Sequence, residues 1–189
     1  DLKFAGEKSF LEIGDNNTFR EFTTMHRGTE GGGGVTKIGS NNLFMAYSHV
    51  AHDCEVGNDI VMANSATLAG HVEVGDAAVI GGLTGVHQFV RIGKMAMVGG
   101  DSKVVKDVPP YVLVDGHPAS ANGINAVGLR RNDVEPEVRQ KIKEAYRILY
   151  RSNLNVSEAI EKMDQELDNS DMVEYFLRFL RNAQRGICK

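Results

Sequence analysis

An apolar residue recurs at every sixth position through most of the first half of the chain. The unbroken series is Ile38, Phe44, Val50, Val56, Met62, Leu68, Val74, Ile80, Val86, Ile92, Val98 and Val104. Every third member is followed by glycine, so a period of six is nested in a period of eighteen. Helices and strands have neither of these periods. The pattern is typical of a hexapeptide solenoid, in which each coil has three six-residue sides and stacks on the coil before it.

The solenoid is predicted over residues 1–110, with loops inserted near residues 1–10 and 26–37. Ile13 continues the series upstream, but it lies 25 residues before Ile38, seven more than one coil. We assign the excess to a loop around the glycine run 31–34. A solenoid needs a cap at each end and none is visible before Asp1, so we expect the chain to be the later part of a longer protein.

The pattern changes after Pro109-Pro110, where a connector rich in Gly, Pro and Asn is expected over residues 111–131. Helical periodicity then predicts a small domain over residues 132–189. Its first helix has Pro136 early, where proline is tolerated. The second, about 156–168, follows Asn155, and the third, about 171–184, is capped by Ser170. Hexapeptide folds are known as left-handed parallel β-helices, so the expected fold is a left-handed parallel β-helix followed by a small α-helical domain.

Composition narrows the function classes. The 189 residues carry a net charge of −4, which argues against a general nucleic-acid or membrane-surface binder. No apolar run is long enough for membrane insertion and no secretory signal is present. Cys54 and Cys188 are interpreted as free thiols in a reducing compartment, so a cytoplasmic location is expected. Most of the 21 glycines are expected at solenoid corners, where the chain needs positive φ or close backbone approach.

Residues eighteen apart should lie about 4.8 Å above one another. His52 then lies under Gly70, and Asp53 lies under His71. His87 falls on the neighbouring column, and His49 and His26 map close to the same place. Five of the six histidines are therefore expected on one corner, which we interpret as a candidate active site.

Two chemistries suit this corner. Imidazoles are good zinc ligands, and some hexapeptide proteins hold a metal with three histidines. Alternatively, Asp53 orients His52 as a general base and the Gly70 N–H binds a developing oxyanion, which is the minimum for acyl transfer to a hydroxyl. Cys54 is expected to point away from the pair, which argues against a cysteine nucleophile.

Several longer motifs resemble one family. They are Ser48-His49-Val50-Ala51-His52-Asp53-Cys54, Asn64 to Val72, Gly81 to Phe89, Asp1 to Glu7, His26 to Thr29 and Asp107 to Tyr111. Together with the helical tail, they resemble the acyl-carrier-protein:UDP-N-acetylglucosamine O-acyltransferases of lipid A biosynthesis. The resemblance covers nearly the whole chain and lacks the family's first coils.

The resemblance implies a homotrimer that transfers an (R)-3-hydroxyacyl group from acyl carrier protein to the 3-hydroxyl of UDP-N-acetylglucosamine, without a cofactor or a metal. It makes His52 the general base, Asp53 its support and the Gly70 N–H the oxyanion donor. It assigns substrate binding to Asp1, Lys3, His49, His71, His87, Gln88, Asn125 and Arg131. Gly100 would set the depth of the acyl groove. The chain departs from the family pattern at Val127 and Asn132, which affects the contacts expected with uridine diphosphate.

Three alternatives remain. The N-acyltransferase of the same pathway shares the solenoid and a histidine base but usually carries an extra N-terminal domain. A hexapeptide metalloenzyme such as the γ-type carbonic anhydrase needs three histidines bridging two subunits, and His49 and His52 have the wrong spacing. A non-catalytic scaffold would gain nothing from clustered histidines.

Overall fold

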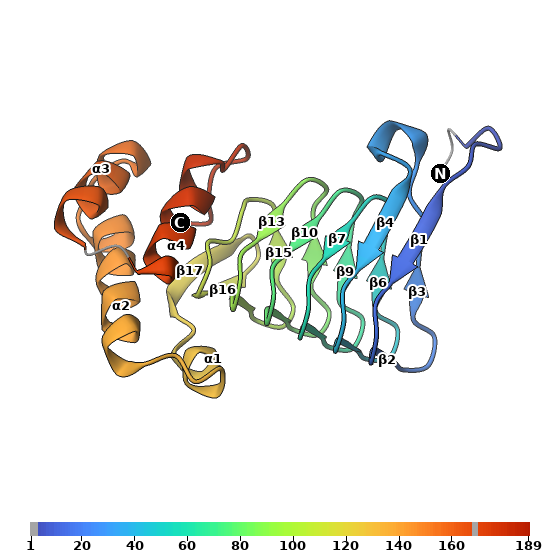
Figure 1. The fold of residues 1–189 in the computed structure, drawn as a ribbon, viewed down its shortest axis with the longest axis horizontal. Helices are drawn as coiled ribbons and strands as arrows, with labels where there is room; N and C mark the ends of the chain where they lie inside the picture. Colours follow the sequence, from blue (N-terminus) through green and yellow to red (C-terminus); the bar gives the residue numbers. More distant parts are fainter. Residues whose placement is uncertain (1–3, 168–169) are drawn as a thin grey trace.

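In the computed structural model, which describes residues 4–167 and 170–189, the strands coil into a three-sided solenoid (Figure 1). The first side consists of β1 (Phe10–Ile13), β4 (Val35–Ile38), β7 (Glu55–Val56), β10 (Glu73–Val74) and β13 (Arg91–Ile92). The second consists of β2 (Thr18–Phe19), β5 (Leu43–Phe44), β8 (Val61–Met62), β11 (Val79–Ile80) and β14 (Met97–Val98), extended by two later strands. The third consists of β3 (Thr24–Met25), β6 (His49–Val50), β9 (Thr67–Leu68), β12 (Gly85–Val86) and β15 (Lys103–Val104). The predicted β-solenoid is confirmed.

The strand register confirms the coil period of eighteen residues. Glu73 pairs in parallel with Glu55 on one side and with Arg91 on the other. Between the first two coils the offset is 25, because Ile13 pairs with Ile38. The extra residues lie between β3 and β4, where the loop includes a short 3-10 helix over Glu30–Gly32. The predicted insertion is therefore present.

The corners show which of the two expected roles the repeated glycines have. At the regular six-residue corners the residue with positive φ is not glycine: examples are Asn41 (φ 62°), Asp53 (φ 60°) and His71 (φ 61°). Glycine takes positive φ in the inserted loop instead, at Gly33 and Gly34. Asn, Asp and His tolerate this left-handed region better than other residues that carry a Cβ. The repeated glycines serve close approach instead, since a Cβ on Gly39 would lie 2.5 Å from the Gly57 carbonyl oxygen.

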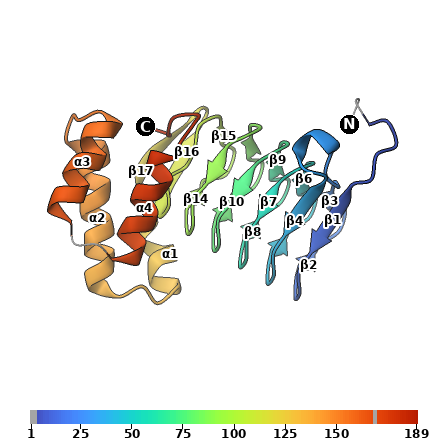
Figure 2. The same ribbon diagram turned by 45° about the horizontal axis from the view of Figure 1, so that its top comes forward.

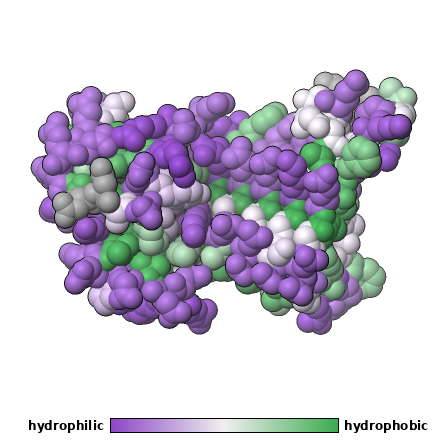
Figure 3. Space-filling model, viewed as in Figure 1, coloured by the Kyte–Doolittle hydropathy of each residue, from purple (hydrophilic) through white to green (hydrophobic). Residues whose placement is uncertain are grey.

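The core is a continuous column inside the solenoid. The second residue of each two-residue strand points inward, and Phe44, Val50, Met62, Leu68 and Ile80 are fully buried. Figure 3 shows a narrow hydrophobic strip along the solenoid, bordered by hydrophilic residues on both sides. The six-residue apolar period is thus the period of the buried column.

Residues 111–131 carry more structure than the sequence suggested for a connector. They form a hairpin of β16 (Val112–Gly116) and β17 (Ala119–Ile124), followed by the helix α1 (Ala126–Arg131). β16 pairs with β14 and so extends the second side of the solenoid. The Gly- and Pro-rich composition hid these strands because it marks turns and connectors equally well.

Three further helices, α2 (Pro136–Arg151), α3 (Val156–Glu166) and α4 (Asp171–Arg181), gather at the end of the solenoid opposite the first coil (Figures 1 and 2). Pro136 begins α2, and Asn155 with Glu158 forms a capping box at the predicted start of α3. Ser170 caps α4, which ends three residues earlier than predicted. No helix in the described part of the chain is long and apolar enough to cross a membrane.

Candidate active site

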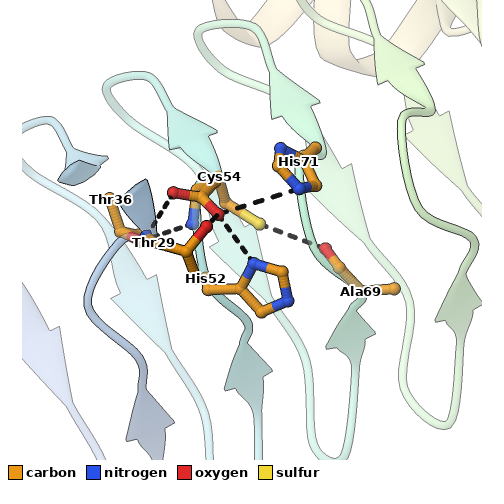
Figure 4. Close-up of polar contacts among 7 residues, drawn as sticks. Thr29, Thr36, His52, Cys54, Ala69 and His71 are labelled. Carbon is orange, nitrogen blue, oxygen red and sulfur yellow. Dashed lines mark hydrogen bonds and ion pairs between the residues drawn. The ribbon is translucent and has the colours of Figure 1, made fainter. Parts of the chain in front are cut away.

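The corner formed by turns 51–54, 69–72 and 87–90 carries the predicted site, and we call it the histidine corner. The Nδ1 atom of His52 lies 2.7 Å from Oδ2 of Asp53 (Figure 4). The Nε2 atom of His71, one coil further on, lies 3.7 Å from the same oxygen. Both imidazoles are partly open to solvent, whereas the Asp53 side chain has no exposed surface. The predicted stacking therefore produces an aspartate enclosed between two accessible histidines.

The inserted loop supplies the remaining partners of Asp53. The Thr29 backbone N–H donates to Oδ1 at 2.7 Å, and the Thr29 hydroxyl donates to Oδ2 at 2.6 Å. The loop lies so close that a Cβ on Gly32 would be 2.0 Å from the Asp53 carboxyl carbon. Thr29 and Gly32 could not be predicted as neighbours of Asp53, because an insertion interrupts the coil period from which neighbours are counted.

These hydrogen bonds keep Asp53 ionised. Burial by itself raises the pKa of a carboxyl group. At Asp53 the bonds from the Thr29 side chain and backbone, with the bond from His52, outweigh burial and lower the pKa below its ordinary value. An anionic Asp53 accepts a hydrogen bond from the Nδ1–H of His52, which leaves the lone pair of a neutral ring on Nε2.

Gly70 lies directly over the His52 ring. A Cβ at position 70 would be 2.7 Å from Cε1 and 2.9 Å from Nε2 of His52, so only glycine fits without moving the ring. Within the described residues the Gly70 N–H donates to no protein acceptor, since the ladder bonds of this turn come from Ala69 and His71. A free N–H beside a basic imidazole suits an anion that develops during a reaction.

The other histidines are arranged around the His52–His71 pair in different ways, and His26 lines a cavity together with His52. His26 and His49 make a second pair, with ring centroids 4.7 Å apart. Burial, and to a smaller extent the nearby His26, lowers the pKa of His49. His87 is exposed and contacts the carbonyl oxygen of Gln88. Phe89 stacks on His71 instead, at 4.4 Å, and the same eighteen-residue rule predicts this neighbour.

Three predicted residues lie apart from this corner. Asn125 is buried, and its side chain already donates to the Met95 carbonyl and accepts from the Gly128 N–H. Arg131 is exposed at the end of α1, at the helical end of the molecule in Figure 1. Gly100 packs on the preceding coil, where an added Cβ would lie 3.3 Å from the Gly82 carbonyl oxygen. Asp1 and Lys3 lie outside the described residues.

Cys54 has the orientation that the sequence predicted. Its side chain is fully buried, and Sγ lies 3.1 Å from the Ala69 carbonyl oxygen. Burial raises the pKa of the thiol to about 11. A neutral thiol inside the core is a poor nucleophile.

Metal binding has one candidate within the described ranges. His52, Asp53 and His71 offer ligand atoms that all lie within 4.8 Å of one another. Both oxygens of Asp53, however, already accept hydrogen bonds from Thr29. The arrangement is therefore explained by an oriented imidazole without invoking an ion.

Comparison with known proteins identifies the family. Residues 107–188 match the family model for UDP N-acetylglucosamine O-acyltransferase, domain 2, and residues 36–70 match the bacterial transferase hexapeptide model. The acyl-[acyl-carrier-protein]–UDP-N-acetylglucosamine O-acyltransferase of Anaeromyxobacter sp. (strain K) is 48% identical over all 189 residues, which cover 74% of that protein. The chain belongs to the UDP-N-acetylglucosamine O-acyltransferase family.

Further relatives agree with this assignment. The protein of the same name from Thermodesulfovibrio yellowstonii is 50% identical over the whole chain and 73% of its own length. The crystal structure of UDP-N-acetylglucosamine O-acyltransferase from Moraxella catarrhalis superposes with a TM-score of 0.96 at 44% identity, covering all of this chain and 74% of that one. The chain is accordingly an acyltransferase. The oriented imidazole of the histidine corner is a side chain that could take part in such a transfer.

Proposed function

We propose that the chain transfers an (R)-3-hydroxyacyl group from acyl carrier protein to the 3-hydroxyl of UDP-N-acetylglucosamine, the first step of lipid A biosynthesis. The observation that carries the proposal is the His52–Asp53 pair with Gly70 packed against the His52 ring. The names of the relatives supply the two substrates.

His52 is the general base in this mechanism. Its Nε2 removes the proton of the sugar 3-hydroxyl while the oxygen attacks the thioester carbonyl carbon. Asp53 holds the Nδ1–H and stabilises the imidazolium that forms. When the tetrahedral intermediate collapses, the C–S bond breaks and the imidazolium returns its proton to the departing thiolate. The proton taken from the hydroxyl leaves on the thiol and the acyl group moves from sulfur to oxygen, so the proposed step needs no cofactor or metal.

The Gly70 N–H stabilises the oxyanion of the intermediate. A fixed donor stabilises the negative charge more than it stabilises the neutral carbonyl, so the barrier falls. The support for this assignment is that glycine at position 70 packs against the His52 ring, which keeps the backbone of residue 70 close to the proposed base.

Substrate binding is proposed to need more than one protomer. His49, His71, His87 and Gln88 would contact the sugar nucleotide from the histidine corner, together with Asp1 and Lys3. Asn125 and Arg131 belong to the helical end of the same chain, so their contacts with uridine diphosphate are assigned to a neighbouring subunit of a homotrimer. The free, buried thiols of Cys54 and Cys188 fit the proposed cytoplasmic location.

The proposal is tested by mixing the protein with UDP-N-acetylglucosamine and a 3-hydroxyacyl carrier protein and measuring the acylated sugar nucleotide by mass spectrometry. We expect product from the wild type, product after chelator treatment, and none from His52→Ala. Loss of product on chelation would indicate that a metal bound by His52, Asp53 and His71 activates the sugar hydroxyl in place of a general base. Acylation of a UDP-glucosamine amine in place of the hydroxyl would favour the N-acyltransferase alternative.

A further inference from the structure

The glycine-rich loop between β3 and β4 holds one residue, Thr29, against the proposed catalytic pair. Both donors of Thr29 reach the Asp53 carboxylate, the backbone N–H at Oδ1 with 2.7 Å and the hydroxyl at Oδ2 with 2.6 Å (Figure 4). The same Oδ2 lies 2.7 Å from Nδ1 of His52. The carboxylate that orients the proposed base is therefore itself oriented, on both oxygens, by a residue of the inserted loop.

The glycines of this loop explain how Thr29 is brought to that place. A Cβ on Gly28 would lie 2.2 Å from the Val35 nitrogen, so the loop leaves the solenoid where only glycine fits. The chain then turns back through Gly33 and Gly34, whose φ values of 92° and 83° favour glycine. The Gly34 N–H donates to the Thr29 carbonyl at 2.8 Å, which closes the loop on Thr29.

Gly32 lies directly against the carboxylate. A Cβ at position 32 would be 2.0 Å from the Asp53 carboxyl carbon and 2.3 Å from each of its oxygens, so a larger residue would displace the loop or the carboxylate. At the neighbouring Gly31 an added Cβ would meet no atom within 4 Å. Of these two glycines, only the one that faces Asp53 is required by packing.

Thr29 also influences the charge of the carboxylate. Burial raises the pKa of Asp53, and the two bonds from Thr29 are the largest of the effects that oppose burial, so that the pKa lies below its ordinary value. Among the described residues, the titratable groups that interact with Asp53 are the imidazoles of His52 and His71 and the buried Cys54 thiol. Interacting groups titrate as a unit. Without the Thr29 hydroxyl, the His52–Asp53 pair should therefore take up its proton at higher pH.

We propose that Thr29 is a positioning residue for acyl transfer and that the glycine-rich loop serves to hold it against Asp53. The inference rests on the proposed function. A direct contact with the substrate is the other role open to Thr29, because it lines the cavity of about 370 Å³ beside His52. The two roles differ in kinetics, since a binding contact changes KM alone, whereas positioning changes kcat and its pH dependence.

Thr29→Val tests the proposal, because it removes the hydroxyl but keeps the shape of the side chain and the backbone donor. We expect kcat in the acyl-transfer assay to fall on the order of tenfold, the factor that one hydrogen bond to a charged group contributes. The acid limb of the kcat/KM profile should move to higher pH. Thr29→Ser keeps the hydroxyl and should restore both properties. Gly32→Ala should move the profile in the same direction as Thr29→Val, whereas Gly31→Ala should leave it in place.

Thr36→Val is the matched control. The Thr36 hydroxyl is as close to Asp53 but accepts from its backbone N–H, at 2.7 Å, and does not donate to the carboxylate. We expect this variant to melt at a lower temperature, because a buried N–H loses its partner, and to keep the acid limb of the wild type. A folded Thr29→Val variant in which only KM changes would assign Thr29 to substrate contact and overturn the proposal, as would unchanged kinetics.

A measurement independent of turnover separates this inference from the proposed function. The ring nitrogens of His52, assigned with His52→Gln in heteronuclear NMR spectra of the whole chain, report protonation of the His52–Asp53 pair. A titration midpoint that rises in Thr29→Val, and not in Thr36→Val, would support the positioning role even if the wild type transfers no acyl group; only the proposed function would then fail. Equal midpoints in the wild type and both variants would overturn the inference.

Discussion

At the corner formed by turns 39–42, 57–60 and 75–78, most polar side chains bond to the backbone, whereas at the histidine corner two imidazoles face one carboxylate. We call the first the asparagine corner. Asn42 is 1% exposed, donates to the Gly57 carbonyl at 3.0 Å and accepts from the Ile60 N–H at 2.7 Å. His52 uses only Nδ1 in its bond to Asp53, and its Nε2 has no hydrogen-bond partner among the described residues.

Both corners use the same backbone conformation. Asn41 and Asp59 have φ values of 62° and 57° at the asparagine corner, and Asp53 and His71 have 60° and 61° at the histidine corner. The left-handed turn therefore does not distinguish a structural corner from a catalytic one. The distinction lies in whether the polar groups are all satisfied within the chain, because an unused nitrogen can take part in chemistry.

The strongest test of this distinction is Asp53→Asn. An amide at this position can donate to Nδ1 of His52, which places the ring proton on Nε2 and removes the base. Loss of general-base catalysis typically costs on the order of 10²–10⁴-fold in rate. We expect kcat to fall within that range in the acyl-transfer assay while circular dichroism stays unchanged. A folded variant with kcat within a few-fold of the wild type would show that Asp53 does not set the tautomer.

The next test is Gly70→Ala, which changes the histidine corner without altering its ionisable groups. The new methyl would lie 2.7 Å from Cε1 of His52, so the ring must move. A displacement near 1 Å can cost about 100-fold, and we expect kcat to fall by about that factor. Gly31→Ala is the matched control, since its Cβ meets no atom within 4 Å. Equal kinetics for the two variants would argue against a positioned ring.

Asn42→Ala breaks the asparagine corner instead. It leaves the Gly57 carbonyl and the Ile60 N–H without their bonds, and unsatisfied buried groups cost about 1–3 kcal/mol each. We expect the free energy of unfolding to fall by about 2 kcal/mol in urea titrations, with kcat unchanged at 25 °C. Asn58→Ala, at an exposed position of the same corner, should have a smaller effect. A large loss of kcat in Asn42→Ala would contradict the assignment of the asparagine corner to stability alone.

The coil period explains which parts of the site could be predicted. A fixed eighteen-residue stack determines vertical neighbours, so the pairs His52 with Gly70 and Asp53 with His71 follow from counting, and so does Phe89 over His71. Thr29 could not be found in this way, because its loop leaves the stack and its path depends on tertiary contacts. Counting placed His87 on the adjacent column, but it could not predict that the exposed side chain bonds to the Gln88 carbonyl oxygen.

At the helical end, local features could be predicted from the sequence and long-range contacts could not. Capping residues are local signals, so Asn155 and Ser170 marked helix starts correctly. The hairpin of β16 and β17 was missed because its pairing with β14 is a long-range contact. Asn125 was expected among the substrate-binding residues, and the sequence did not indicate that its side chain is buried and bonds to Met95 and Gly128.

The smallest expected effect concerns the second histidine pair, His26 and His49. Its hydrogen bonding is intermediate between that of the asparagine corner and that of the histidine corner. His49 is bonded on one side, to the Thr24 hydroxyl at 2.7 Å, and its pKa is lowered by burial and by His26. A histidine with a lowered pKa binds fewer protons in the folded state. Stability is therefore full above the unfolded value of about 6.5 and declines as the pH falls below it.

His49→Gln removes this titration, so its unfolding free energy, measured by urea titration from pH 8 to pH 5, should decline less than that of the wild type. His26→Asn removes the repulsion but keeps the burial, so its curve should lie between the two. Parallel curves for all three proteins would mean that His49 is as easily protonated in the fold as outside it. In that case the second pair would belong with the solvent-exposed histidines, and His52 with His71 would be the one pair whose environment the fold controls.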